Sequence, residues 1–78
     1  MNILELLRAD KEQIIYRYYP NGSNNTGEVM YDYKSDKVSV SKPAKDDEDG
    51  YFSHKACKKI LELVKKNSFP LKFTQAWY

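Results

Sequence analysis

The residues of this chain with the greatest capacity for chemistry are His54 and Cys57, the only histidine and the only cysteine among its 78 residues. A separation of three residues places the two side chains on neighbouring positions of a helix, and the start of a helix lowers the pKa of a thiol. A cysteine nucleophile also needs an oriented base and an oxyanion site. Cys57 instead falls on the apolar stripe of the helix predicted around it, so we expect a packed thiol.

Other catalytic motifs are missing from the sequence. It contains no phosphate-binding glycine loop, no dinucleotide-binding fingerprint and no nucleophile elbow. A chain of this length also buries only a little over ~60% of its unfolded surface, which makes a deep active-site cavity costly. We predict that the protein is not an enzyme, uses no cofactor and acts through its surface.

A run of four acidic residues at positions 46–49 is the candidate for metal binding, because hard cations prefer carboxylate oxygens. Aligning Gly50 with the required glycine of an EF-hand loop puts Lys45 at the first ligand position and Ala56 in place of the bidentate glutamate. One cysteine and one histidine are too few for a structural zinc site. We therefore predict no metal site, and expect the acidic run to solvate a loop and to interact with the positive start of the following helix.

Aromatic residues make up 14% of the chain, including seven tyrosines. Most must fill the core, which leaves Tyr19, Tyr51 and Tyr78 for the surface. Tyrosine is favoured at protein interfaces, and an exposed strand edge can add a strand from a partner. The leading prediction is a small non-catalytic protein–protein interaction module, namely a regulator, inhibitor or immunity-type protein. Its partner is another protein or a second copy of the chain. The expected partner-binding residues are Arg17, Tyr19, Tyr51, Lys55, Lys58 and Lys59.

The first two predicted elements are a short helix and a strand. Asn2 followed by Glu5 has the spacing of a capping box, which predicts a helix over about residues 3 to 9. Gln13 to Tyr19 is rich in strand-forming residues, and Arg17 indicates its outer face. The turn-forming residues that follow predict a flexible hairpin loop.

A β-hairpin is predicted next in the chain. Glu28 to Lys34 and Lys37 to Ser41 both alternate apolar and polar residues, with the period of half-buried strands. A two-residue turn at Ser35-Asp36 would pair Tyr33 with Val38. The valines and tyrosines of both strands then share one face, which indicates an antiparallel pair.

The second predicted helix runs from an N-cap at Ser53 to about Lys66 and ends at Asn67, a residue that tolerates the left-handed conformation. Leu71 to Tyr78 alternates again and predicts a last strand or an extended strap, whose place in the sheet the sequence leaves open. A strand beside the one at Gln13 to Tyr19 would be parallel to it, with a right-handed crossover. The expected fold is one α+β domain over residues 1–78. It has the order α-β-β-β-α-β, a three- or four-stranded antiparallel sheet, and one long and one short helix on one face.

Basic residues are concentrated near the C-terminus, with six lysines and only Glu62 between positions 55 and 72. The segment Ser53-His54-Lys55-Ala56-Cys57-Lys58-Lys59, together with the predicted order of elements, resembles the double-stranded RNA-binding domain. That resemblance implies an RNA- or DNA-binding domain that uses the lysine-bearing helix. The preceding acidic run would repel phosphates and the net charge is only +2, so nucleic-acid binding is the alternative to protein binding.

The expected compartment is the cytoplasm. A single cysteine allows no intrachain disulfide, which is typical of a reducing environment. The first residues lack the basic and apolar regions of an export signal, and no apolar stretch is long enough to span a bilayer. We predict no membrane association.

Overall fold

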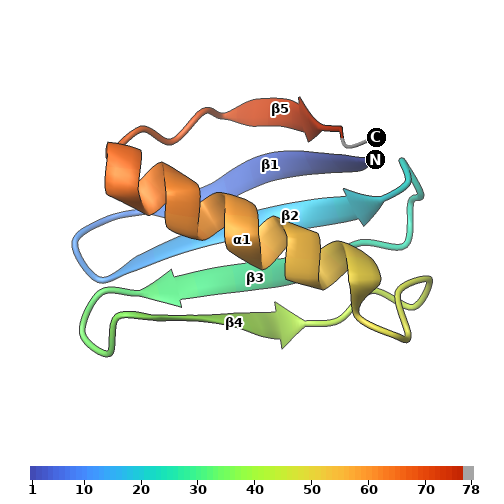
Figure 1. The fold of residues 1–78 in the computed structure, drawn as a ribbon, viewed down its shortest axis with the longest axis horizontal. Coiled ribbons are helices and arrows are strands. Elements are labelled where there is room, and N and C mark those ends of the chain that lie inside the picture. The colour runs from blue at the N-terminus through green and yellow to red at the C-terminus, as the bar shows by residue number, and fades with distance from the viewer. Residues whose placement is uncertain (77–78) are drawn as a thin grey trace.

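The computed structural model describes residues 1–76, in which five strands form one antiparallel sheet and a single helix crosses one face of it (Figure 1). The α+β class with an antiparallel sheet is confirmed. The predicted order α-β-β-β-α-β with two helices is wrong, because the described chain runs β-β-β-β-α-β. The elements are β1 (Asn2–Ala9), β2 (Gln13–Pro20), β3 (Gly27–Asp32), β4 (Lys37–Lys42), α1 (Tyr51–Lys66) and β5 (Lys72–Gln75).

The segment predicted as the first helix is strand β1, which pairs with β2 on one side and with β5 on the other. The register between β1 and β2 shifts between Leu6 and Arg8, so Leu7 is an extra residue in β1. This bulge explains why the apolar residues of β1 do not alternate cleanly. Two helical turns would have been marginal alone, whereas a strand with a neighbour on each side satisfies its backbone groups.

Strand β5 lies at one edge of the sheet, antiparallel to β1. The placement considered from the sequence, parallel and directly beside β2, is wrong because β1 already occupies that side of β2. The side chain of Asn2, predicted to cap a helix, instead donates from Nδ2 to the carbonyl of Phe52 at 2.9 Å and to Oε1 of Gln75 at 3.2 Å. It therefore ties β1 to α1 and to β5.

The predicted hairpin is formed by β3 and β4, but its register is shifted by two residues. Val38 pairs with Tyr31 rather than Tyr33, so residues 33–36 form a four-residue loop. The Asp32 carboxylate accepts hydrogen bonds from the backbone N–H and the hydroxyl of Ser35, and Asp36 adopts a positive φ of 55°. A shift of two residues keeps every side chain on its predicted face, since side chains in a strand alternate with period two.

Helix α1 begins at Tyr51, before the predicted N-cap at Ser53, and ends at Asn67 as predicted. The Ser53 hydroxyl donates to the carbonyl of Gly50 at 3.0 Å instead of capping the helix. Asn67 has φ 51°, and its backbone N–H reaches the carbonyls of Leu63 and Val64. The left-handed C-cap is therefore confirmed.

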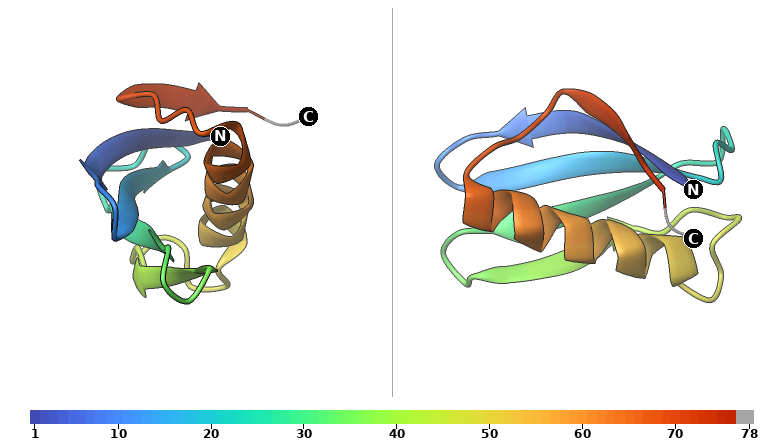
Figure 2. Two further views of the ribbon diagram at one scale, coloured as in Figure 1. Left: turned by 90° about the vertical axis from the view of Figure 1, so that its left-hand side faces the viewer. Right: turned by 45° about the horizontal axis from the view of Figure 1, so that its top comes forward.

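The core lies between α1 and one face of the sheet, while no helix among residues 1–76 covers the opposite face (Figure 2, left). Side chains at alternate positions of β2 and β3 point toward α1 and are buried. The fully buried apolar residues include Leu4, Tyr16, Tyr18, Val29, Ala56 and Ile60.

Tyr16 is expected to make the folded state sensitive to alkali. Its hydroxyl donates to the carbonyl of Pro70 at 2.7 Å, and burial raises its pKa from 10.0 to about 12. The folded state then holds a proton that the unfolded state loses, so this stabilisation is complete below pH 10 and is lost as the pH rises toward 12. The urea midpoint of unfolding should be lower above pH 11 than at pH 9. This difference should be smaller for Tyr16→Phe than for the wild type. An equal fall in the variant would assign the alkaline sensitivity to other groups.

Candidate protein-binding surface

The six predicted partner-binding residues do not form one site, because they lie on opposite sides of the sheet. Arg17 and Tyr19 belong to β2 and alternate with the buried positions that face the helix, so they lie on the uncovered face. The other four, Tyr51, Lys55, Lys58 and Lys59, belong to α1. Figure 2 (left) shows α1 packed on one face of the sheet, with the opposite face uncovered.

Arg17 and Tyr19 are held by a carboxylate on the neighbouring strand. The Tyr19 hydroxyl donates to Oε1 of Glu5 at 2.8 Å, and an Arg17 nitrogen lies 3.4 Å from the same oxygen. Both residues are half-buried. Their polar groups are therefore engaged within the sheet, and a partner would have to bind them in that arrangement.

The lysines of α1 divide between the two long sides of the helix. Lys59 Nζ lies 6.0 Å from the ring centroid of Phe73 in β5 and 3.5 Å from Oε1 of Glu62. The Lys55 carbonyl accepts a hydrogen bond from Gln75, also in β5. Lys58 lies on the other side, toward β4. A phosphate backbone that followed one side of α1 would therefore contact only some of these three lysines. Nucleic-acid binding stays a prediction.

Lys58 lies in a groove between α1 and the edge of the sheet, with a volume of about 450 Å³. Val40 and Leu61, which both line it, are 38% and 39% exposed and are therefore among the exposed large apolar residues of the chain. We call this hollow the β4–α1 groove. Its walls include Val38, Val40, His54, Cys57, Lys58 and Leu61.

Cys57 and His54, the pair singled out for chemistry, both line the β4–α1 groove. Burial raises the pKa of the Cys57 thiol above its ordinary value, so the thiol is protonated at neutral pH. A protonated thiol is a poor nucleophile. Within residues 1–76, no cluster of three or more His, Cys, Asp or Glu side chains has an arrangement that would hold a metal ion.

Strand β4 is the long open edge of the sheet. Within the described chain it pairs only with β3, so its backbone groups on the other side have no strand partner. Five of its six residues are exposed, the exception being Val38. An open row of backbone donors and acceptors beside an apolar groove is suited to pairing with an extended segment.

The acidic run has a structural role in at least two of its four residues. Asp47 is 3% exposed, and its carboxylate accepts hydrogen bonds from the backbone N–H groups of Phe52 and Ser53, both at 2.8 Å, and from the Tyr18 hydroxyl at 3.2 Å. Asp46 accepts hydrogen bonds from the side chains of Ser23 and Asn25 in the β2–β3 loop. The interaction with the start of α1 that the sequence indicated is made by Asp47 and by Asp49, whose Oδ1 accepts a hydrogen bond from the backbone N–H of Tyr51 at 3.2 Å.

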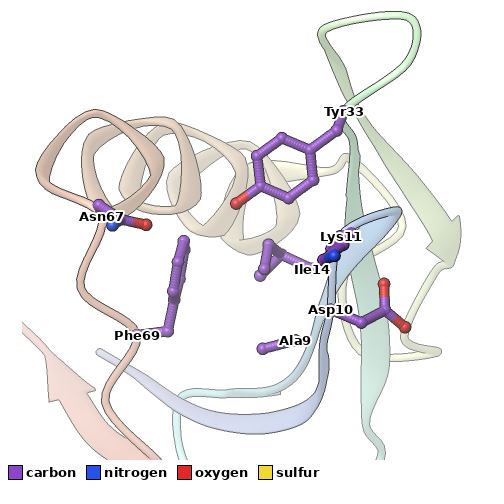
Figure 3. Close-up of a pocket in the computed structure, with 7 residues that line it drawn as sticks. All are labelled: Ala9, Asp10, Lys11, Ile14, Tyr33, Asn67 and Phe69. Atoms are coloured by element: carbon purple, nitrogen blue, oxygen red, sulfur yellow. The ribbon is translucent and has the colours of Figure 1, made fainter.

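A second hollow lies where the β1–β2 turn meets the end of α1 (Figure 3). Its walls are mainly apolar, with the ring of Tyr33 above Ile14 and the ring of Phe69 beside it in this view. Tyr33, expected in the core, is 38% exposed here. The Asp10 carboxylate is occupied by Arg8 and by the backbone N–H groups of Glu12 and Gln13. This hollow therefore offers apolar contact but no available carboxylate.

Of the predicted site residues, only Lys58 lies in the β4–α1 groove. The sequence did not reveal Val38, Val40 and Leu61 as site residues, because a regular strand and a regular helix each account for them locally. One signal in the sequence did indicate that β4 forms an edge. The alternating residues of Lys37 to Ser41 are followed by the acidic run at positions 46–49, which ends the series of strands. Tyr51 is 47% exposed, as predicted, and Tyr78 lies outside the described residues.

The fold and the groove define a class: a small two-layer α+β domain with one helix on an antiparallel sheet and an open edge strand. Comparisons with protein-family models, with curated proteins and with solved structures find no match for this chain. Within residues 1–76, no helix has both the length and the apolar composition needed to cross a membrane.

Proposed function

We propose that this protein is a non-catalytic protein-binding module that pairs an extended segment of another protein with strand β4. The observation that carries the proposal is the open edge of β4 lying directly beside the β4–α1 groove. Strand addition of this kind obtains affinity from backbone hydrogen bonds and specificity from pockets that accept alternate side chains. Val38 and Val40, two positions apart in β4, line the groove that would receive such side chains.

This binding mode suits a regulator, an inhibitor or an immunity-type protein, since each of these acts by occupying a surface of its target. We place the protein in the cytoplasm, because its single cysteine is half-buried and its fold needs no disulfide. Lys58 is the member of the predicted set that contributes directly to this surface. Arg17, Tyr19, Tyr51, Lys55 and Lys59 stay predictions for contacts elsewhere.

Substitution of Leu61 with glutamate is expected to abolish partner capture. Leu61 is 39% exposed, so the fold should tolerate the change while a charge enters the apolar wall of the groove. The matched control is Leu71→Glu, a site that is 77% exposed and does not line the groove. Lysate proteins retained on the immobilised wild-type domain would be identified by mass spectrometry, with circular dichroism verifying that each variant folds.

We expect the wild-type domain and Leu71→Glu to capture the same proteins and Leu61→Glu to capture none of them. Nuclease treatment of the lysate should not change this capture. Equal capture by folded Leu61→Glu would contradict the use of the groove. Loss of the captured proteins on nuclease treatment would instead favour the lysine-bearing helix as a nucleic-acid surface.

A further inference from the structure

We infer that the segment bound at β4 is an extended strand of a different protein, with acidic residues at both ends and apolar residues facing the β4–α1 groove. This inference rests on the proposed strand-addition function and specifies the chemistry of the partner.

Strand β4 begins and ends with lysine. Lys37 pairs with Asp32 of β3, and Lys42 pairs with Glu28 after a register shift that leaves Ser41 as an extra residue. Among residues 1–76, neither lysine is bonded to a carboxylate within 4.0 Å, and both are exposed. Opposite charges on directly paired residues of neighbouring strands are favourable. A strand added outside β4 would therefore continue the alternation of charge by placing acidic residues opposite the lysines.

The β4–α1 groove determines which residues suit the middle of the bound segment, between its acidic ends. Its walls include the apolar residues Val38, Val40 and Leu61, and Lys58 of α1 is also one of the lining residues. The residues lining it are apolar, small and polar, or basic, and none of them is acidic. A bound strand would point every second side chain toward this wall, because strand side chains alternate between the two faces. Apolar residues at those positions would fill the groove, and Lys58 would add to the preference for an acidic segment.

A second copy of this chain fits the edge poorly. Because Ser41 is an extra residue in β4, Lys37 and Lys42 lie on the same face of the strand. Two β4 strands paired antiparallel about a two-fold axis at Ser39 would then bring Lys37 of each copy opposite Lys42 of the other. Like charges directly opposite each other are destabilising, and lysines on edge strands commonly prevent self-pairing. The same two residues thus disfavour a homodimer and favour an acidic partner.

The test is a selection of random short peptides displayed on phage against the wild-type domain. The expected result is enrichment of peptides with alternating apolar residues between Asp or Glu, whose binding is lost with Leu61→Glu and retained with Leu71→Glu. For synthetic copies of these peptides, Lys37→Glu/Lys42→Glu should weaken binding about tenfold and shift a fresh selection toward basic ends. A matched double variant, Lys11→Glu/Lys72→Glu, changes net charge equally but away from β4, since Lys72 lies in β5 at the opposite edge of the sheet, and should leave the affinity within about twofold.

Binding should also slow alkylation of Cys57, which lines the groove and is the only thiol. Leu61-dependent peptides without an acidic bias would overturn the inferred partner chemistry but leave the proposed function standing. Enriched peptides that bind folded Leu61→Glu as well as the wild type would overturn both. Concentration-dependent dimers in sedimentation that dissociate with Leu61→Glu would show that a second copy occupies the edge, which also overturns the inference.

Discussion

Replacing Gly27 with alanine is expected to destabilise the fold by about 3 kcal/mol, a large part of the roughly 4–12 kcal/mol available to a domain of this size. Gly27 pairs with Tyr18 across β2 and β3, and the Tyr18 ring packs over the position that a side chain would occupy. A Cβ there would also lie 2.5 Å from the carbonyl oxygen of Lys42. Neither the buried ring nor the backbone oxygen can withdraw without disturbing the sheet.

Thermal unfolding followed by circular dichroism would measure this effect, with an expected fall in Tm of roughly 10–20 °C. Gly22→Ala is the matched control. Gly22 has a positive φ of 76°, but its Cβ would make only an ordinary van der Waals contact, 3.9 Å from the Met1 side chain. It should therefore cost only about 1 kcal/mol of backbone strain. If Gly27→Ala were no more destabilising than Gly22→Ala, the close packing at Gly27 would be refuted.

Replacing Asp47 with alanine is expected to cost a similar amount, about 3 kcal/mol. The change removes the acceptor for two backbone N–H groups at the start of α1 and for the Tyr18 hydroxyl. Loss of a helix cap costs about 1 kcal/mol, and a buried hydroxyl left without its acceptor adds ~1–3 kcal/mol. Asp47→Asn keeps the size of the side chain but exchanges one acceptor oxygen for a donor, so its effect should be intermediate.

Urea unfolding at neutral pH would measure the cost, with Asp46→Ala as the control from the same acidic run. Asp46 is exposed and bonds only to side chains of the β2–β3 loop, so its removal should change stability by no more than about 0.5 kcal/mol. A double-mutant cycle with Tyr18→Phe should show coupling of about 1 kcal/mol between Asp47 and Tyr18. Equal costs for the two aspartates, or no coupling, would contradict a structural role for Asp47.

The sequence-based prediction failed where one pattern fitted two structures. The apolar residues of Asn2–Ala9 suit a short helix docked on a core, and they also suit a strand interrupted by a bulge at Leu7. The capping spacing of Asn2 and Glu5 favoured the helix. Pairing with both β2 and β5 makes this segment a strand. The paired residues are as many as 73 positions apart in the chain. A local pattern contains no information about such partners.

The candidate site was only partly visible in the sequence for a related reason. Lys58 stood out by its charge, and Cys57 by its chemistry. Val38, Val40 and Leu61 looked like ordinary core residues, because an apolar residue at a regular position indicates a buried face without saying what covers it. Their partial exposure follows from the place of β4 at the edge of the sheet, where α1 covers the face only in part.

The sequence by itself determined the elements whose signals are local: the helix ending at Asn67, the strand beginning at Gln13, and the faces of the β3–β4 hairpin. These depend on periodicity and capping, which act between residues a few positions apart. Only the tertiary structure decided that Asn2–Ala9 is a strand, that β5 lies beside it, and that β4 is left as an open edge next to a groove. Strand order depends on pairing between distant segments, where free energy comes from burial and hydrogen bonds that exist only once the whole chain has folded.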